Sequence, residues 1–302
     1  MYSKLKILLL AAVIWGTSFV SAHAADVPTR AAPIIVFMTD YGTLDDSVAI
    51  CKGVMLSIAP DARIIDLTHQ VPAYSVADGA RFLTRASLYY PASTIFVAVV
   101  DPGVGTKRQS IIAKTKRGQF FVLPDNGLLT QIEARDGIEG VREITNKDWM
   151  LPDFHSATFH GRDIFSPAAA HLARGEDWTK AGPALPKLTR LTLSAASVDE
   201  RGLEGHVVAL DGPFGNLITD IKADRFKQLG YQIGEKVTVQ VGDKSFTVPF
   251  VSTFGDVPNG QPLLYIDSSD LLSLAINMGN FAQTHHVTPP VRLFIAKRTE
   301  RK

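Results

Sequence analysis

Asp101, Arg108 and His160 are the three side chains of this sequence best suited to hold a water molecule for reaction. A carboxylate and a neutral imidazole can accept hydrogen bonds, whereas a guanidinium donates them and stabilises developing hydroxide. Asp101 begins the turn Asp-Pro-Gly-Val-Gly after the apolar segment 94–100, and Arg108 follows closely enough to return to that loop. This combination indicates hydrolysis without a metal. The alternative for Asp101 and Arg108 is a turn with a surface ion pair.

Two more carboxylates stand near the ends of apolar, strand-like segments. Asp40 follows 34–38, and Asp66 lies near the end of 62–67. In open α/β sheets the carboxyl ends of parallel strands share one edge, where ligands bind. Asp40, Asp66 and Asp101 are therefore expected at one edge, with Asn126 in a further polar turn. Each of these residues alone is also typical of a helix cap or a turn.

Established catalytic and metal-binding motifs are absent from the sequence. It contains no CxxC, HExxH, EF-hand loop, GxxxxGK[ST], GxGxxG or GxSxG pattern. Cys51 is the only cysteine, so no internal disulfide can form. A metal site built from His155, His160 and Asp163 is conceivable, but this spacing matches no established ligand geometry. We therefore predict no metal and no cofactor, and expect Asp163 to be a helix cap or part of a structural ion pair.

The order of the expected elements predicts an α/β domain over residues 33–190, with a largely parallel central sheet. Apolar strands alternate with helices at about 45–57, 75–90, 128–134 and 164–173, and 110–115 pairs with 119–123. The composition shifts near 182–203. Strands at 206–210, 237–241, 245–250, 263–266 and 291–296 then predict a smaller β domain, a sheet or barrel, over 200–298.

The first 24 residues have the pattern of a secretory signal peptide. Lys4 and Lys6 precede the apolar segment 7–15, and 21–24 ends in an A-x-A pattern that suits cleavage before Ala25. The alternative is a membrane anchor, but the apolar run is short for a span of ~20 residues. We expect a secreted protein, in a bacterial periplasm, with no membrane contact after cleavage.

The charge balance argues against a nucleic-acid or charged-membrane partner. The chain has 31 basic and 30 acidic residues, a net charge of +1, and no block of one sign. We expect a small molecule as the substrate.

Seven motifs in a fixed order carry a resemblance to a known family. They are TDYG (39–42), DLTH (66–69), VDPGVGT (100–106), PDNGL (124–128), FHGRDIFSPAAAHLA (159–173), DGPFGN (211–216) and INMG (276–279). In these motifs the chain closely resembles the S-adenosyl-L-methionine hydroxide adenosyltransferases, or SAM hydrolases, whose relatives include fluorinase and chlorinase. The resemblance covers about residues 33–298.

The resemblance implies an N-terminal α/β domain, a C-terminal β-barrel and a homotrimer with active sites between neighbouring subunits. It also implies a reaction in which water and S-adenosyl-L-methionine give adenosine and L-methionine. The family's water-positioning triad falls on Asp101, Arg108 and His160. Water would attack C5′ in line with the departing sulfur, with no cofactor.

Substrate-binding roles are implied by the same resemblance. Asp40 matches the family carboxylate that binds the ribose diol. Asp211 matches the residue that pairs with the ammonium group of methionine. Phe214 and Asn216 match adenine contacts, and Tyr74 an aromatic residue against the substrate. The remaining expected contacts are Asn126, Phe159, Ser268 and Ser269, the last two at the methionine end.

Departures from the halogenases favour hydrolysis over halogenation. Asp101 and Val104 stand where their halide pocket has Tyr and Thr, and Gly161 stands where it has Ser. An anionic carboxylate repels halide but accepts a hydrogen bond from water. Two further alternatives remain at this point, a non-catalytic periplasmic protein that binds adenosine or S-adenosylmethionine, and a metal-dependent nucleotide hydrolase.

Overall fold

The computed structural model describes residues 32–153 and 156–298. The predicted signal peptide, residues 1–24, lies outside the described residues, and so does His155. Within the described ranges, no helix has the length and apolar character needed to cross a membrane.

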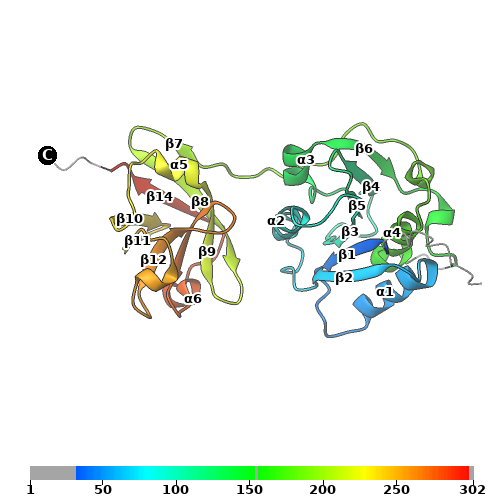
Figure 1. The fold of residues 1–302 in the computed structure, drawn as a ribbon, viewed down its shortest axis with the longest axis horizontal. Coiled ribbons are helices and arrows are strands. Elements are labelled where there is room, and N and C mark those ends of the chain that lie inside the picture. Colours follow the sequence, from blue (N-terminus) through cyan, green and yellow to red (C-terminus); the bar gives the residue numbers. More distant parts are fainter. Residues whose placement is uncertain (1–31, 154–155, 299–302) are drawn as a thin grey trace, which may run out of the picture. The chain divides into compact units, whose positions relative to one another are not determined.

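A six-stranded, largely parallel sheet forms the first part of the described chain (Figure 1). Its strand order is β2-β1-β3-β5-β4-β6, in which β2, β1, β3 and β5 are parallel and β4 is antiparallel to both of its neighbours. The bounds are β1 (Ile34–Thr39), β2 (Arg63–Thr68), β3 (Ile95–Val99), β4 (Ser110–Thr115), β5 (Phe120–Pro124) and β6 (Ile138–Glu143). The predicted α/β class is confirmed.

Helices cover both faces of this sheet, because successive side chains of a buried strand point to opposite sides. On β1, Ile35 and Phe37 lie in one core cluster with residues of α1 and α4. Val36 and Met38 lie in another with residues of α2 and α3. Figure 1 shows these layers. The helices are α1 (Ser47–Ile58), α2 (Val76–Ser87), α3 (Thr130–Asp136) and α4 (Ser166–Ala173).

Two helix starts illustrate how the local sequence sets the structure. Ser75 caps α2 as predicted, since its side chain accepts a hydrogen bond from the Asp78 amide. The helix predicted over 164–173 begins earlier and differently. One π-helical turn, η2 (Gly161–Phe165), leads directly into α4. Such turns are frequent at functional sites.

The second sheet is antiparallel and barrel-like. It has eight strands in the order β11-β10-β14-β8-β9-β13-β12, with β7 paired to β8. A bridge between Phe250 and Leu264 links the two ends, so that the sheet nearly closes. The bounds are β7 (Ser197–Val198), β8 (Gly202–Asp211), β9 (Asn216–Lys222), β10 (Lys236–Val241), β11 (Lys244–Pro249), β12 (Pro262–Ile266), β13 (Leu271–Ile276) and β14 (Val291–Ala296).

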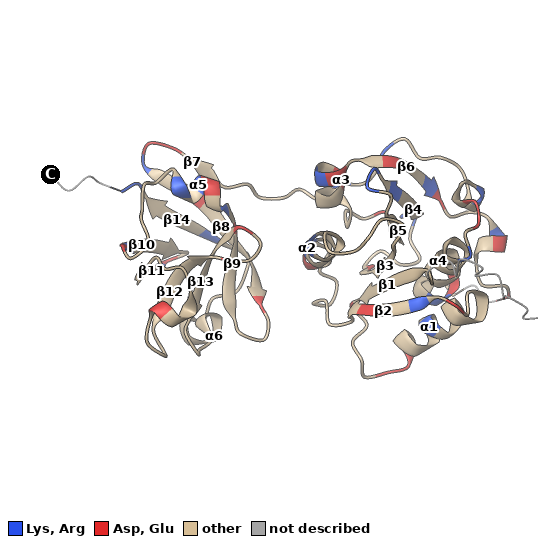
Figure 2. Ribbon diagram, in the orientation of Figure 1, with Lys and Arg blue, Asp and Glu red and all other residues tan. Residues whose placement is uncertain are grey.

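Short helices α5 (Ala223–Lys227) and α6 (Phe281–His285) accompany this sheet. Acidic and basic residues stand side by side on α5, as Figure 2 shows. The strands predicted at 237–241 and 245–250 are present, and they pair as the β10–β11 hairpin. The division of the chain into domains at 33–190 and 200–298 stays a prediction.

Candidate functional site

Asp101 lies at the carboxyl end of β3, as predicted, and the surrounding backbone holds it there. The Val104 amide donates to the Asp101 carbonyl at 3.2 Å and closes the turn. The Asn126 side-chain amide donates to the Val100 carbonyl at 2.8 Å, immediately before Asp101. Asn126 therefore supports the strand end that presents Asp101. Its predicted contact with a substrate stays a prediction.

Gly105 allows the Asp101 loop to approach the chain before His160. Its backbone has φ +76°, and a Cβ there would overlap the carbonyl oxygen of Ala157. Gly105 therefore permits close packing of two loops of the protein.

Arg108 turns inward onto Asp101. Its Nε lies 2.9 Å from both carboxylate oxygens, and Nη2 also donates to Oδ2. The two side chains are only 9% and 5% exposed, so the alternative of a surface ion pair is wrong. Nη1 donates to the Ser110 hydroxyl at 2.7 Å, and the guanidinium lies 5.4 Å from the Phe165 ring centroid. A planar guanidinium held on several sides is a rigid donor.

The same guanidinium contacts His160, so the three predicted residues meet in space. Arg108 Nη2 lies 2.6 Å from His160 Nδ1. A guanidinium only donates, so Nδ1 must accept, and the neutral ring then carries its proton on Nε2. Burial, and secondly the nearby Arg108 cation, lower the pKa of His160 below its ordinary value. The imidazole is accordingly neutral near pH 7.

A small cavity of about 260 Å³ brings Asp101 and His160 together with Asp40 and Tyr74. Asp40 Oδ2 accepts a hydrogen bond from the Tyr74 amide at 2.9 Å. Tyr74 has φ 66° and an exposed side chain. The other residues that line this cavity are Tyr41, Ala73, Val99, Val104, Thr158 and Gly161. We call this cavity the reaction pocket.

A separate cavity of about 920 Å³ gathers the predicted binding residues of the second sheet. Asp211 and Asn216 are cross-strand partners at the β8–β9 turn, and Phe214 protrudes from that turn. Ser268 also lines this cavity, whereas Ser269 does not, and its amide donates to Asp267 at 2.8 Å. We call this cavity the barrel pocket. The barrel pocket and the reaction pocket share no lining residue.

Other predicted residues have mainly structural surroundings. Asp66 is held by Lys52 at 2.6 Å and His69 at 3.1 Å, and it does not line the reaction pocket. The expected parallel order of these strands is present, but Asp66 lies within β2, opposite Phe37 of β1, and Lys52 and His69 hold it in a network outside the reaction pocket. Phe159 packs edge-on against Tyr41, with centroids 6.0 Å apart.

Asp163 is buried, and it accepts from Arg162 Nε at 2.6 Å and the Ser156 amide at 2.7 Å. The predicted structural ion pair is confirmed. Because His155 lies outside the described residues, the candidate metal site cannot be drawn. In the part of the chain that the structure describes, no three His, Cys, Asp or Glu side chains form a group that could hold a metal ion.

Tyr41 is a member of the reaction pocket that the sequence pattern does not predict. It belongs to the TDYG motif, but only the carboxylate of that motif suggested chemistry. Its position in the pocket depends on a contact with Gly161, far along the chain. Spacing in the sequence carries no signal for such a contact.

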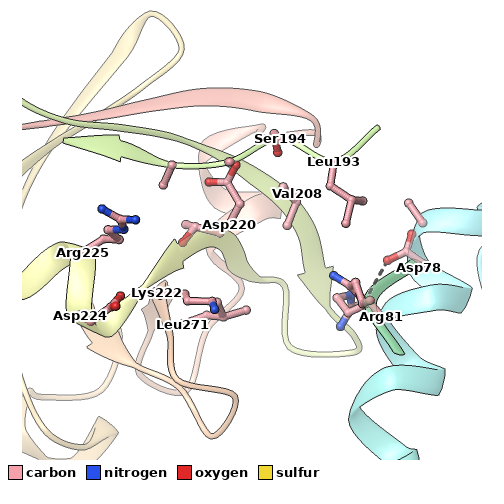
Figure 3. Close-up of a pocket in the computed structure, with 15 residues that line it drawn as sticks. Asp78, Arg81, Leu193, Ser194, Val208, Asp220, Lys222, Asp224, Arg225 and Leu271 are labelled. Atoms are coloured by element: carbon pink, nitrogen blue, oxygen red, sulfur yellow. Dashed lines mark hydrogen bonds and ion pairs between the residues drawn. The ribbon is translucent and has the colours of Figure 1, made fainter. Parts of the chain in front are cut away.

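Figure 3 shows a further cavity, lined by α2 residues, the segment 193–196 and residues of β8, β9, α5 and β13. Its labelled side chains include the ion pair between Asp78 and Arg81, at 3.0 Å, together with Asp220, Lys222, Asp224 and Arg225. None of the predicted site residues lines it.

Sequence profiles decide the family. A profile described as "SAM hydroxide adenosyltransferase N-terminal domain" matches residues 35–182, and one for the C-terminal domain matches 205–292. The chain belongs to the SAM hydroxide adenosyltransferase family. The resemblance predicted from the seven motifs is confirmed.

Curated relatives of this SAM hydroxide adenosyltransferase family member carry two names. A protein of Salinispora tropica named "(R)-S-adenosyl-L-methionine hydrolase" is 41% identical over 266 residues, or 86% of this chain and 97% of that protein. A "Fluorinase" of Actinopolyspora mzabensis is 33% identical, over 84% of this chain and 94% of that protein.

Among solved structures, an uncharacterized conserved protein from Thermotoga maritima superposes with a TM-score of 0.82 at 40% identity. The match covers 86% of this family member and 99% of that chain.

Proposed function

We propose that the protein hydrolyses S-adenosyl-L-methionine to adenosine and L-methionine, by in-line attack of water at C5′. The observation that carries this proposal is the contact of Arg108 with both Asp101 and His160 at the wall of the reaction pocket. The name of the 41% identical Salinispora tropica relative supports the same substrate.

The reaction is a substitution in which the leaving group needs no proton. The water oxygen forms a bond to C5′, the C5′–S bond breaks, and its electron pair neutralises the sulfonium to give the thioether of methionine. The attacking water gives up one proton. Holding the reactants in line can contribute ~7–11 kcal/mol at best, and a proton acceptor about 10²–10⁴-fold in rate.

Each residue of the triad has a distinct role in this mechanism. The Asp101 carboxylate keeps acceptor capacity beyond the Arg108 contacts, so it accepts from the water and takes its proton before release to solvent. His160 carries its proton on Nε2 and orients the water as a donor, which replaces the accepting role expected from the sequence. Arg108 fixes both partners.

Asp101 also favours water over a halide ion as the nucleophile. Its negative charge stands at the wall of the reaction pocket, and an anion placed there is repelled. A neutral water molecule is attracted to the same oxygen atoms. This supports hydrolysis over the activity for which the fluorinase relatives are named.

The substrate-binding roles follow from the two cavities. Asp40 in the reaction pocket would bind the ribose diol, since its second oxygen remains available. Phe214 and Asn216 would contact adenine, Asp211 the ammonium, and Ser268 the methionine end. Because these groups line separate cavities, we propose a homotrimer in which the barrel pocket of one subunit completes the reaction pocket of its neighbour.

We further propose that the protein is exported to a bacterial periplasm and cleaved before Ala25. N-terminal sequencing of protein from the periplasmic fraction tests this. A sequence beginning at Ala25 is the expected result, and a mature chain that retains residues 1–24 contradicts it.

The reaction itself is tested by product analysis in ¹⁸O-labelled water. Incubation with S-adenosyl-L-methionine is expected to release methionine and adenosine that carries the label on its 5′-oxygen. Binding by calorimetry without any product would identify a binding protein instead. Loss of activity with a chelator would point to a metal-dependent hydrolase.

A further inference from the structure

The Tyr41 hydroxyl occupies the space beside Gly161 that a side chain would otherwise take. A Cβ built on Gly161 would overlap the Tyr41 hydroxyl oxygen and lie 3.2 Å from Cζ. Both residues line the reaction pocket with Asp101 and His160. Gly161 directly follows His160, so the phenol oxygen lies next to the backbone that carries the imidazole.

Tyr41 is held firmly in this position. Its amide donates to Thr39 Oγ1 at 3.2 Å, and that hydroxyl lies 2.9 Å from His69 Nδ1. His69 Nε2 in turn lies 3.1 Å from Asp66. One arrangement of protons satisfies all three contacts. The Thr39 hydroxyl accepts from the Tyr41 amide and donates to His69 Nδ1, and His69 Nε2–H donates to Asp66. This chain of hydrogen bonds connects Asp66 to the backbone amide of Tyr41.

The ring of Tyr41 is packed, but its hydroxyl has no hydrogen-bond partner among the described residues. Phe159 meets the ring edge-on, and the ring packs against the core cluster below α1 and α4. Burial is the main cause that raises the pKa of Tyr41 above its ordinary value, so the phenol stays protonated and can donate. A pocket-lining donor without a protein partner is available to a bound molecule.

We infer that Tyr41 is a specificity-determining residue, whose hydroxyl limits the nucleophile position beside His160 to the size of a water molecule. The inference rests on the proposed hydrolysis and deepens it. Asp101 discriminates against anions by charge, whereas Tyr41 discriminates against larger neutral nucleophiles by size.

Removing only the hydroxyl tests this role. In water containing methanol, wild-type protein should form adenosine alone. Tyr41→Phe should also form 5′-O-methyladenosine, since the vacated oxygen position admits a methyl group. Tyr90→Phe is the matched control, because Tyr90 is a half-buried tyrosine that packs edge-on against Phe96 outside the pocket.

A second variant tests the contact without relying on activity. Gly161→Ala should lower the melting temperature, because its Cβ overlaps the Tyr41 oxygen. Adding Tyr41→Phe should recover most of that loss, since the 3.2 Å approach to Cζ can relax by a small shift.

Two results overturn the inference. One is a Tyr41→Phe variant that gives the wild-type product ratio in water containing methanol. The other is equal melting temperatures for Gly161→Ala with and without Tyr41→Phe. Absence of adenosine formation by wild-type protein counts against the proposed function instead, and the melting-temperature comparison still decides on the contact.

Discussion

Arg108 places a permanent cation 2.6 Å from Nδ1 of His160, and this contact decides the protonation of the imidazole. A second positive charge on the ring would face the guanidinium at hydrogen-bond distance and leave Nδ1 without an acceptor role. The neutral ring with its proton on Nε2 is the form that the contact stabilises.

The pH dependence of activity should reflect this neutral form. Because the pKa of His160 lies below its ordinary value of 6.5, lowering the pH through 6.5 should leave kcat/KM unchanged, and the loss should come at more acidic pH. The contribution of His160 to the free energy of unfolding should also fall as the pH is lowered. An unfolded chain takes up the proton near pH 6.5 before the folded one does, so the contribution of His160 is complete above pH 6.5 and declines below it.

A pH–rate profile, together with an NMR titration of the His160 ring, measures both effects. His160→Gln identifies the resonance. A midpoint at or above pH 6.5 would contradict the assigned tautomer and its cause.

Replacing Asp101 by asparagine should remove the proton acceptor. Asp101→Asn is expected to lower kcat by about 10²–10⁴-fold, with a smaller change in KM. It also leaves the buried Arg108 without its counter-charge, so the melting temperature should fall. Steady-state kinetics and thermal unfolding measure the two effects. Asp199→Asn is the matched control, since Asp199 pairs with Arg201 at the exposed surface. Equal kinetics for both variants would refute a catalytic role for Asp101.

Gly105 should tolerate no side chain. Gly105→Ala combines a positive φ with overlap of the Ala157 carbonyl oxygen, so we expect a loss of about 1–3 kcal/mol in the free energy of unfolding. Gly118→Ala is the control for φ alone, because its φ is +81° but the nearest contact, Ala92 Cβ, is 3.6 Å away. Chemical denaturation compares the two variants. A cost at Gly105 no larger than that at Gly118 would show that the loop contact is unimportant.

The proposed homotrimer, in which two subunits form each active site, predicts complementation between inactive chains. Phe214→Ala should weaken substrate binding through the barrel pocket, and Asp101→Asn should stop the reaction in the reaction pocket. Mixed assemblies then contain some sites with both wild-type halves, so co-refolding the two variants should restore part of the activity. Activity equal to the sum of the separate variants would indicate that each chain forms its own complete site.

Local sequence predicted most of the first sheet because its signals are unambiguous there. The β3 segment is apolar on both faces, and Ser75 is a strong N-cap before α2. Four strands are not predicted by the pattern. β7 has only two residues, and Gly140 and charged residues interrupt β6. β9 directly follows the turn at 212–215, and β13 is a Leu-rich segment compatible with a helix. Pairing with neighbouring strands selects their conformation.

The three residues were predictable because each stands beside a turn signal. Asp101 begins the Pro-Gly turn after an apolar segment, Arg108 follows that turn, and His160 precedes Gly161. What the sequence could not display is how the side chains divide the hydrogen bonds. The donor role of His160 depends on one distance to Arg108, and the surroundings of Asn126 depend on the Val100 carbonyl. Tyr41 and Gly161 belong to different motifs, so only the folded chain shows that one fills the space of the other.

Because any side chain at position 161 would overlap Tyr41, the order in which these two positions change matters for the evolution of the pocket. A lineage that acquires a serine or alanine at 161 first must pass through a strained protein. One that loses the hydroxyl at 41 first keeps a folded intermediate, at the cost of a less selective pocket. A new nucleophile should therefore enter this lineage through a change at position 41 that precedes any change at position 161.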